Sequence, residues 1–305
     1  MNDLILVTGS EGLVGSRFLE ISESKNNFHT PTQIEMDITK PSEIKAILAS
    51  YDFKAIIHFA AYTDVSAAEK ERGNKNGDCW LVNVEGTRNL AEAVKASEKK
   101  IHFVHISTDM VFSGSKRDRG PYREDHKPER DLSKLTWYGY TKAEAEREVL
   151  NILGEQVSIL RIIYPVRASY EARLDYIRLP LSLHDRNELY PLFSDQHISI
   201  SFIDEVCNAI DVIIKRNLYG IYHASTTDTT TPYELISLVI EKTRGEKNKV
   251  KSIKLDEYLR KNNIPEYRYP RYGGLKVEDS ETKLDFKFST YKQVIDKLVA
   301  QGLGK

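Results

Sequence analysis

The chain of 305 residues is 40% hydrophobic and 29% charged, so it can bury a full core as one large domain or two intimate ones. Its formal net charge of -1 excludes a global field that would recruit nucleic acid or an anionic membrane. No stretch approaches the ~20 apolar residues of a membrane span. The two cysteines, Cys79 and Cys207, lack a spacing typical of a metal site or a disulfide framework. We therefore expect a cytoplasmic protein without metal, nucleic-acid or membrane partners.

Residues 4–7 form a short apolar run typical of a buried parallel strand, and Gly9, Gly12 and Gly15 follow it directly. Glycine permits a tight turn and lets backbone amides approach a ligand. A helix beginning near Leu13 would point the positive end of its dipole at the same place. A pyrophosphate suits this arrangement, which favours a dinucleotide-binding site over the alternative of a simple glycine helix cap.

The second strand is predicted within residues 27–30, and the acidic residue that usually meets the adenosine ribose is missing after it. No clear basic residue replaces it, so the choice between NAD and NADP stays open, with a slight preference for NADP(H). Residues 33–38 are interpreted as the next strand. Asp37 near its end can accept a hydrogen bond from the adenine amino group, cap the helix that begins at Pro41, or do both.

A further buried strand is predicted over residues 54–61, and it ends in two alanines that let a cofactor pass close to the backbone. A polar loop over 62–78 then leads to a predicted helix over 81–94. Asn83 would lie on the same helical face as Leu90 and would therefore face the sheet. Because a buried amide needs partners, Asn83 either braces the active-site strand or bonds to a neighbouring loop.

A strand predicted over residues 101–106 ends in two adjacent hydroxyls, Ser107 and Thr108, at the edge where ligands of open α/β sheets collect. Tyr138 and Lys142 stand four residues apart at the start of a strongly helical run, so both side chains lie on one face. A nearby ammonium is expected to draw the pKa of Tyr138 down from about 10. Such spacings also occur by chance, and strand-end hydroxyls are often caps. Their coincidence favours proton transfer to a carbonyl group that the hydroxyl holds.

These motifs, in this order, resemble the extended branch of the short-chain dehydrogenase/reductase superfamily, and within it the dTDP-4-dehydrorhamnose reductase-like group. The resemblance covers roughly the first half of the chain. The motifs that carry it are Thr8-Gly9-Ser10-Glu11-Gly12-Leu13-Val14-Gly15, Ala60-Ala61-Tyr62-Thr63-Asp64-Val65 with Glu69, Asn83 with Gly86-Thr87 and Asn89-Leu90, Ser107-Thr108-Asp109-Met110-Val111-Phe112, and Tyr138 to Lys142.

The resemblance implies an α/β fold, with a Rossmann-like doubly wound parallel sheet and a smaller, discontinuous substrate-binding lobe. Tyr138 would be the general acid, Lys142 would lower its pKa and hold the nicotinamide ribose, and Thr108 would bond the substrate oxygen. The residues implied for the cofactor are Gly12, Leu13 and Val14 at the pyrophosphate, Asp37 and Ile38 at the adenine, and Ala60, Ala61 and Thr63 at its middle. The other cofactor-binding residues that the resemblance implies are Gly9, Glu11, Phe59, Asn83, Tyr138 and Lys142. The residues implied for the substrate are Thr108, Asp109 and Tyr164.

Four features depart from this group. Met110 stands where the group usually has tyrosine, and Tyr164 where it has tryptophan, which keeps an aromatic platform beside the sugar but alters its shape. Ile200 and Ser201 stand where a Pro-Thr pair is usual. A long charged loop over 113–133 indicates a different rim around the active site. These departures weaken the assignment of a particular sugar, whereas the residues expected to carry the redox reaction, Thr108, Tyr138 and Lys142, are all present.

We expect residues 1–165 and 201–224 to form the NAD(P)-binding domain, and 166–200 and 225–305 the substrate-binding lobe. The aromatic and basic stretch 267–274 lies where relatives cover the nucleotide; it can stack a base and hold phosphate, or pack a surface loop. Arginine side chains in the first part of the lobe suit either a diphosphate or a solvated helix. These arginines are Arg167, Arg173, Arg178 and Arg186.

The second half of the chain is predicted to rejoin the sheet through a helix over residues 202–215 and a returning strand over 220–224. Pro232, at the first position of the following helix, and Glu234, in its first turn, are typical of a helix start.

These predictions favour NAD(P)H-dependent reduction of a 4-keto group on a nucleotide-diphosphate sugar, most like dTDP-4-dehydrorhamnose. A nucleotide-sugar epimerase or dehydratase of the same superfamily is one alternative, but no glutamate follows Asp109, which argues against dehydration. The other alternative is a non-catalytic regulatory subunit that keeps the nucleotide site. The intact Thr108, Tyr138 and Lys142 argue against it. The resemblance also allows a homodimer.

Overall fold

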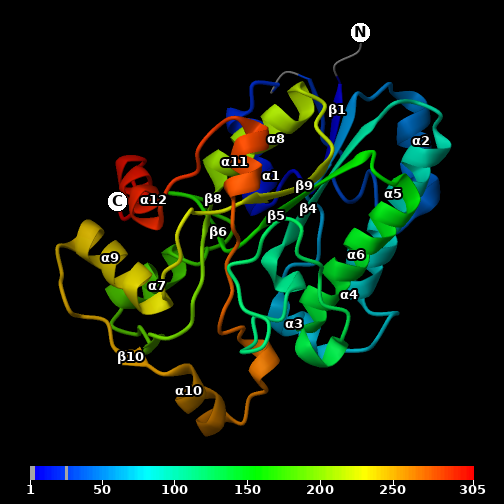
Figure 1. Cartoon of the computed structure of the whole chain (residues 1–305). Helices are drawn as coiled ribbons and strands as arrows, with labels where there is room; N and C mark the ends of the chain where they lie inside the picture. The colour runs from blue at the N-terminus through cyan, green and yellow to red at the C-terminus, as the bar shows by residue number, and fades with distance from the viewer. Residues whose placement is uncertain (1–3, 25–26) are drawn as a thin grey trace. The chain divides into compact units, whose positions relative to one another are not determined.

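The computed structural model describes residues 4–24 and 27–305 and divides into two compact units (Figure 1). Unit 1 comprises Met1–Val111, Lys127–Arg161 and Cys207–Tyr222, and unit 2 comprises Phe112–His126, Ile162–Val206 and His223–Lys305. These bounds differ from the expected domains chiefly at residues 112–126, which cluster with unit 2. The assignment of the cofactor to the first unit and of the substrate to the second stays a prediction.

Six strands form one sheet in the order β2 (Phe28–His29), β1 (Ile5–Thr8), β3 (Ala55–His58), β4 (His102–Thr108), β5 (Val157–Ile162) and β9 (Gly220–Ala224). β1 pairs in parallel with β2 and β3, and β3 pairs in parallel with β4. Every residue of β1, β3, β4 and β5 is buried, as expected for strands of a parallel sheet that helices cover on both faces. The predicted α/β fold class is confirmed.

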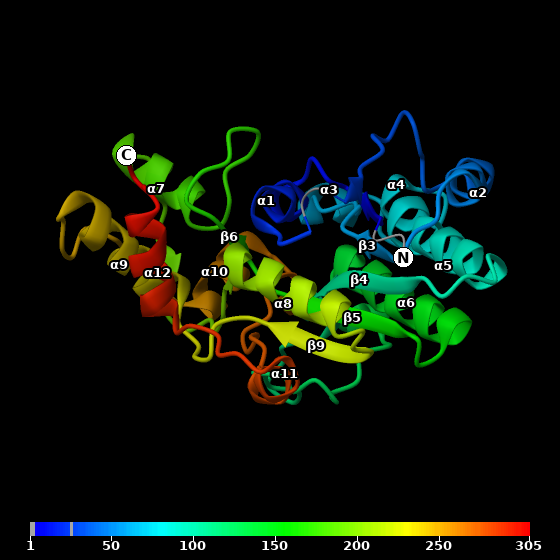
Figure 2. The same cartoon turned by 90° about the horizontal axis from the view of Figure 1, so that it is seen from above.

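Helices cover the two faces of this sheet (Figures 1 and 2). They are α2 (Pro41–Ser50), α5 (Thr87–Ala96) and α6 (Trp137–Leu153) on one face, and α1 (Leu13–Ile21) and α8 (Ile203–Lys215) on the other. Ile44 of α2 and Leu90 of α5 share one buried cluster with Ile56 and Phe103 of the strands. Leu90 therefore faces the sheet, as the helical periodicity predicts.

The prediction of a strand over residues 33–38 is wrong, because this segment forms turns. The backbone amides of Glu35 and Met36 both donate to the carbonyl of Thr32, which closes a local turn in place of a sheet ladder. Ile34 is 95% exposed, so the apolar residues of this segment do not all point to a core. An alternating pattern six residues long does not distinguish a strand from such a turn.

The interval between β3 and α5 is more ordered than a polar loop. It contains α3 (Val65–Lys70), α4 (Asp78–Trp80) and the π-helix η1 (Leu81–Gly86). Asp64 is the N-cap of α3, and its carboxylate accepts hydrogen bonds from the amides of Ser66 and Ala67. The predicted helix over 81–94 thus exists, but its first turn is wound as a π-helix and only the remainder is α-helical.

The 3-10 turns η2 (Asp109–Val111) and η3 (Leu132–Lys134) precede α6. The helix over residues 202–215, the strand over 220–224 and the helix starting at Pro232 are all confirmed.

Within the described residues, no helix combines the length and apolarity that a membrane crossing requires.

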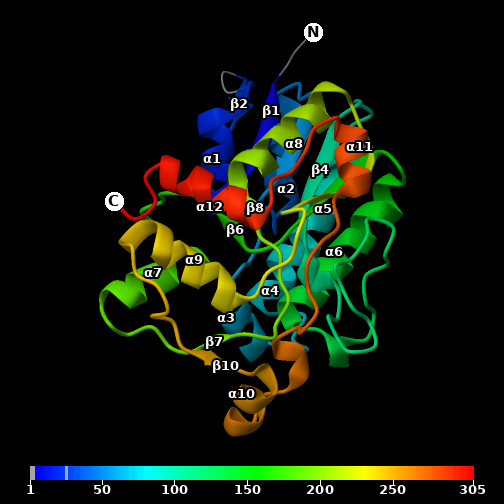
Figure 3. The ribbon, with the colours of Figure 1, turned by 60° about the vertical axis from the view of Figure 1, so that its left-hand side comes forward.

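Unit 2 holds two small parallel sheets and a layer of helices (Figure 3). Its elements are β6 (Pro165–Val166), α7 (Arg178–Asp185), β7 (Leu192–Phe193), β8 (Ser201–Phe202), α9 (Pro232–Arg244), β10 (Ser252–Ile253), α10 (Leu255–Asn262), the 3-10 turn η4 (Glu266–Arg268), α11 (Glu278–Leu284) and α12 (Tyr291–Ala300). α9 packs against both α7 and α12. A capping box at Thr231 and Glu234 starts α9, as the Pro232 signal predicts.

Candidate active site

The candidate site residues of unit 1 follow three neighbouring parallel strands. Gly9 comes directly after β1, Phe59 after β3, and Thr108 is the last residue of β4. Because these strands are parallel, all three residues lie at the same carboxyl edge of the sheet, where open α/β sheets bind ligands.

The glycine-rich turn requires glycine at two positions for reasons of space. Gly9 has φ +66°, and a Cβ on it would lie 2.5 Å from the backbone nitrogen of Ala60. A Cβ on Gly15 would lie 2.4 Å from the carbonyl oxygen of Gly9. Gly12 is the N-cap of α1 and provides no side-chain cap. The turn thus brings the amino end of a helix up to the sheet edge without side chains in the way, which fits a pyrophosphate.

The residues that the resemblance implies for the cofactor are accessible in this unit to different degrees. Gly12 and Thr63 are exposed, whereas Phe59 and Ala60 are half-buried. Glu11 is exposed as well, and the remaining half-buried members of the set are Gly9, Leu13, Val14, Asp37, Ala61 and Tyr138.

Asp37 caps a turn ahead of α2. Its Oδ1 accepts hydrogen bonds from the amide (2.9 Å) and the hydroxyl (2.7 Å) of Thr39. The N-cap of α2 is Lys40, without a side-chain bond, so Asp37 does not cap the helix itself. The carbonyl oxygen of Ile38 accepts from the side chain of Asn89 (3.0 Å), which fixes this segment against α5. Contact of Asp37 and Ile38 with adenine stays a prediction.

Asn83 lies in the π-helix η1 and joins the loop after β3 to α6. Its Oδ1 accepts from the amide of Tyr62 (2.8 Å), and its Nδ2 donates to the carbonyl of Tyr62 (3.2 Å) and to Oγ1 of Thr141 (3.0 Å). Of the two alternatives from the sequence, the bond to a neighbouring loop is therefore present. The contact with Thr141 adds a brace on the helix that carries Tyr138.

Three side chains fix the start of α6. The Thr136 hydroxyl accepts from the amide of Gly139 (3.0 Å) as the N-cap, and the Glu69 carboxylate accepts from the amide of Trp137 (2.9 Å). Arg72 pairs with Glu69 and donates to the carbonyl of Leu135 (3.0 Å). These roles of Glu69 and Arg72 are not predictable from local patterns, because their backbone partners lie about 60 residues away in the chain.

The phenol of Tyr138 pairs with the side chain of Thr108. Burial of Tyr138 raises its pKa above the ordinary value, and the negative charge of Asp109 raises it further, while the hydrogen bond with Thr108 acts in the opposite direction. The net lowering of this pKa that the spacing to Lys142 predicts is therefore not found, and an effect of Lys142 on the tyrosine stays a prediction. Tyr138 keeps its proton throughout the neutral pH range.

Lys142 is buried and directed into the strand beside it. Its Nζ donates to the carbonyl oxygen of Ile106 (2.8 Å) and lies 3.3 Å from Nε2 of His105. Burial lowers the pKa of Lys142 to about 8, against the attraction of the Glu146 carboxylate, so the ammonium form still predominates at neutral pH.

A buried ion pair lies one helical turn beyond Lys142. The guanidinium of Arg161 on β5 donates to both carboxylate oxygens of Glu146 (2.9 and 2.7 Å), and the Ser107 hydroxyl of β4 donates to the same carboxylate (2.6 Å). The two charged side chains are 0% and 1% exposed. This pair connects α6 to two strands at once. No local pattern predicts it, because the three residues meet only in the fold.

In unit 2, Tyr164 stacks on Tyr176 with ring centroids 4.1 Å apart and has φ +39°. A non-glycine residue with positive φ is uncommon, and such strain is frequent at ligand sites. Arg178 pairs with Asp175 (2.9 Å) and donates to two backbone carbonyls, so it serves the structure of the lobe rather than a solvated helix face. A substrate role for Tyr164 stays a prediction.

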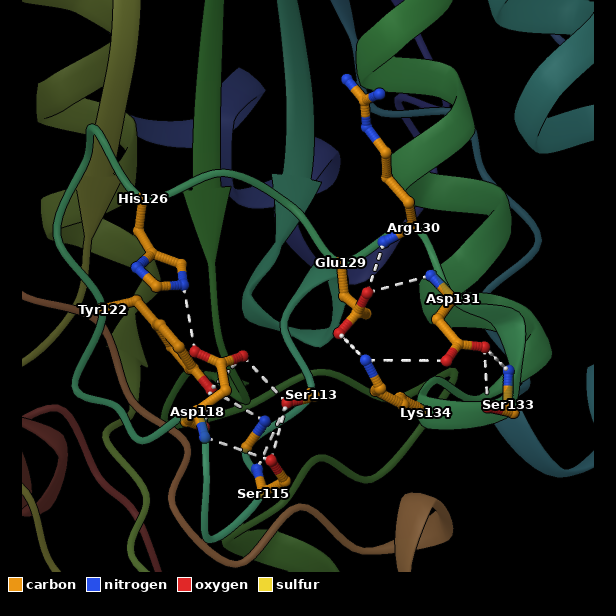
Figure 4. Close-up of polar contacts among 11 residues, drawn as sticks. Ser113, Ser115, Asp118, Tyr122, His126, Glu129, Arg130, Asp131, Ser133 and Lys134 are labelled. Atoms are coloured by element: carbon orange, nitrogen blue, oxygen red, sulfur yellow. Dashed lines mark hydrogen bonds and ion pairs between the residues drawn. The ribbon is translucent and has the colours of Figure 1, made fainter.

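The charged loop predicted over 113–133 is held together by its own side chains (Figure 4). In its first part, the Asp118 carboxylate accepts from Ser113 (2.8 Å) and pairs with His126 (3.1 Å). In its second part, Glu129 accepts from the amide of Asp131 (3.0 Å) and pairs with Lys134 (3.1 Å). No cluster of three or more potential metal ligands occurs among residues 4–24 and 27–305.

Comparison with known proteins agrees with this geometry. A probable dTDP-4,6-dihydroxy-2-methyloxan-3-one 4-ketoreductase of Streptomyces antibioticus is 27% identical over 232 residues, 75% of this chain and 74% of that protein. A dTDP-4-keto-6-deoxy-D-glucose reductase of Streptomyces niveus is 25% identical over 268 residues, 88% of each chain. The crystal structure of dTDP-4-dehydrorhamnose reductase from Bacillus anthracis str. Ames in complex with NADP superposes with a TM-score of 0.83 at 22% identity, covering 98% of this chain and 99% of that one.

The sheet order, the glycine-rich turn after β1 and the tyrosine and lysine at the start of α6 define the extended class of short-chain dehydrogenases/reductases. Within that class, the family model described as the RmlD substrate binding domain matches residues 1–303, so the chain belongs to this family. The resemblance inferred from the sequence motifs is thereby confirmed.

Proposed function

We propose that this protein catalyses the NAD(P)H-dependent reduction of a 4-keto group on a nucleotide-diphosphate sugar, most like dTDP-4-dehydrorhamnose. The observation that carries the proposal is the paired phenol of Tyr138 and hydroxyl of Thr108 at the carboxyl edge of the sheet, in a chain of the RmlD substrate binding domain family. The three relatives compared above are named for related keto sugars.

Tyr138 is proposed as the general acid. Reduction adds a hydride to the carbonyl carbon and a proton to its oxygen, and NAD(P)H, when bound, supplies the hydride. The raised pKa of Tyr138 keeps its phenol protonated at neutral pH, as proton donation requires. Thr108 is proposed to donate a second hydrogen bond to the same oxygen, and Asp109 to contact the substrate beside it.

Lys142 is proposed to act twice. Its ammonium stabilises the tyrosinate that remains after Tyr138 has given up its proton, and it donates to the nicotinamide ribose. Both tasks require the charged form, and the pKa of about 8 keeps that form in the majority below this pH. Asn83 is proposed to support both residues through its bond to Thr141 on α6.

The glycine-rich turn is proposed to hold the pyrophosphate through residues 9–14, with Asp37 and Ile38 at the adenine and residues 59–63 along the middle of the cofactor. Unit 1 would then bind the cofactor and unit 2 the sugar nucleotide, with Tyr164 as an aromatic surface beside the sugar. We further propose NADP(H) as the preferred cofactor, a cytoplasmic location, which suits two buried cysteines, Cys79 and Cys207, outside any disulfide, and a homodimer.

The test follows oxidation of NADH and of NADPH with a panel of nucleotide 4-keto sugars. We expect oxidised cofactor and reduced sugar in equal amounts, and a loss of roughly 10²–10⁴-fold in kcat for Tyr138→Phe. Tyr140→Phe, two residues along the same helix and stacked on Trp137, is the matched control and should keep the parent rate.

Three results would reject the proposal. Turnover of a sugar without net cofactor oxidation would indicate an epimerase. Dinucleotide binding without turnover of any sugar in the panel would indicate a regulatory subunit. Equal rates for the parent and Tyr138→Phe would remove the acid role.

A further inference from the structure

A second ionisable side chain lies behind Lys142. His105 lies on β4 and is fully buried. Its Nε2 lies 3.3 Å from Nζ of Lys142, and its Nδ1 is a buried polar atom without a hydrogen-bond partner in the described part of the chain. A buried polar atom left unpaired costs free energy, so its presence beside the candidate site calls for an explanation.

The charge of His105 follows from its surroundings. Burial lowers its pKa well below the ordinary value, and the positive charge of Lys142 lowers it further. The ring is therefore neutral. An ammonium can only donate, so the facing Nε2 must accept, which assigns the ring proton to Nδ1. Nε2 thus accepts a hydrogen bond from Lys142, while the N–H group at Nδ1 is left without an acceptor among the described residues.

We propose that His105 is a positioning residue of the redox site: its Nε2 accepts a hydrogen bond from Lys142 and, together with the Ile106 carbonyl, fixes the direction of the ammonium group. The inference rests on the proposed function, because it assigns Lys142 the cofactor and tyrosinate contacts described above.

The number of donors supports this role. An ammonium carries three protons at fixed angles to one another. His105 and the Ile106 carbonyl each accept one, which leaves the third proton to donate to the nicotinamide ribose of the proposed reaction. Without the acceptor at His105, only the Ile106 carbonyl would restrain rotation of the ammonium group, and the direction of the third proton would be less well defined.

The other ionisable groups around Lys142 do not supply this contact. Glu146, on the next turn of α6, is paired with Arg161. The Cys79 thiol of α4 is neutral, since burial raises its pKa to about 11. His58 on β3 is neutral, since burial lowers its pKa to about 3, and its two nitrogens lie at hydrogen-bonding distance from Thr8 and Thr87.

A matched control lies on the same strand. His102 is also buried, its Nδ1 also lacks a partner among the described residues, and its Nε2 lies 2.7 Å from the Ser158 hydroxyl, away from Lys142. Loss of either histidine removes one buried ring and one hydrogen bond. Only the loss of His105, and not that of His102, should alter the cofactor contact of Lys142 and its pH dependence.

The experiment compares His105→Leu, His105→Gln and His102→Leu. Affinities for NADH and NADPH are measured by cofactor fluorescence between pH 6 and 10, and stabilities by urea unfolding. In the parent, affinity should fall as the pH rises through about 8, where Lys142 loses its proton. We expect His105→Leu to bind about tenfold more weakly than His102→Leu at pH 7 and to lose affinity at a lower pH. His105→Gln, which keeps a hydrogen-bond acceptor, should keep most of the parent's cofactor affinity and most of its pH profile.

Equal affinities and pH profiles for the two leucine variants would overturn the positioning role and leave a purely structural histidine. If His105→Leu does not fold, His105→Asn, which is too short to reach Lys142, provides the same comparison. Cofactor binding is measured without a sugar substrate, so the proposed function and the positioning role of His105 can be rejected independently of each other. Absence of turnover in the parent rejects the proposed function, whereas normal turnover with an unshifted His105 variant rejects only the present inference.

Discussion

Two regions of unit 1 serve the candidate site by different physical means. The glycine-rich turn is defined by side chains that are missing: a Cβ on Gly9 or Gly15 would overlap backbone atoms. The region behind Lys142 is defined by side chains that meet from several elements, namely Ser107 and His105 of β4, Glu146 of α6 and Arg161 of β5. The turn depends on local backbone geometry, whereas the region behind Lys142 depends on the whole sheet being assembled.

This difference predicts how each region responds to substitution. A change in the turn should act locally, through strain and loss of cofactor binding. A change behind Lys142 leaves a buried charge or an unsatisfied polar group, so it should act on the stability of the unit as a whole.

The largest expected effect comes from Arg161→Met. It leaves Glu146 buried and uncompensated, and should lower the free energy of unfolding by about 3–5 kcal/mol. Arg88→Met is the matched control, because Arg88 also pairs with a glutamate of α6, Glu148, but is 30% exposed. It should cost less than about 1 kcal/mol. Urea denaturation measures both, and similar losses would contradict the importance of burial.

Gly9→Ala should have the next largest effect. The added Cβ meets the strain of a positive φ and a backbone atom at 2.5 Å, so we expect a loss of roughly 2–4 kcal/mol and of dinucleotide binding. Gly73→Ala separates the two causes, since Gly73 also has positive φ (+80°) but nothing within 4 Å of the added Cβ. Unfolding and fluorescence titration give the two readouts. Unchanged binding in Gly9→Ala would remove this turn from the cofactor site.

Thr136→Ala removes the N-cap of α6 and should cost about 1 kcal/mol. It should also lower kcat, because the cap sits two residues before Tyr138. Thr290→Ala removes the corresponding cap of α12 in unit 2 and should cost a similar amount without lowering kcat. If both variants kept the parent kcat, the cap would serve stability alone.

The pH dependence should separate activity from stability. Burial holds the pKa of Lys142 at about 8 in the folded protein, below the ordinary 10.5. Between these values the unfolded chain binds the extra proton, so this group makes the protein more stable as the pH rises from about 8 to 10.5. Activity should fall over the same interval, because Lys142 loses its charge. Rate profiles and urea midpoints at matched pH values measure the two trends, and parallel trends would reject this pKa assignment.

Local sequence patterns predicted the parts of the molecule that local chemistry controls. The strand before Gly9, the helix starts near Leu13 and Pro41, and the strand that ends at Thr108 are all present. These features depend on short apolar runs, glycine spacing and helix-start residues, each contained within a few positions.

The patterns failed at two places, one where a local turn replaces a strand and one where the partners of a side chain lie far away in the chain. The segment 33–38 has the alternation of a strand, but Thr32 and Glu35 close a turn there. The four-residue spacing of Tyr138 and Lys142 suggested that one lowers the pKa of the other. In the structure, Lys142 donates to β4, while burial and Asp109 determine the titration of Tyr138. Spacing along a helix places two side chains on one face, but it does not determine which partners they find.

The π-helix η1 adds a consequence for comparisons within the family. A π-turn accommodates one residue more than an α-turn, so it behaves as a single-residue insertion that the helix has absorbed. Deletion of one residue from Leu81–Gly86 would remove this insertion and restore regular α-helical winding, with the helix faces on either side left in place. In an alignment, the residue equivalent to Asn83 must therefore be identified from its contacts, since counting positions back from Leu90 would select a different side chain.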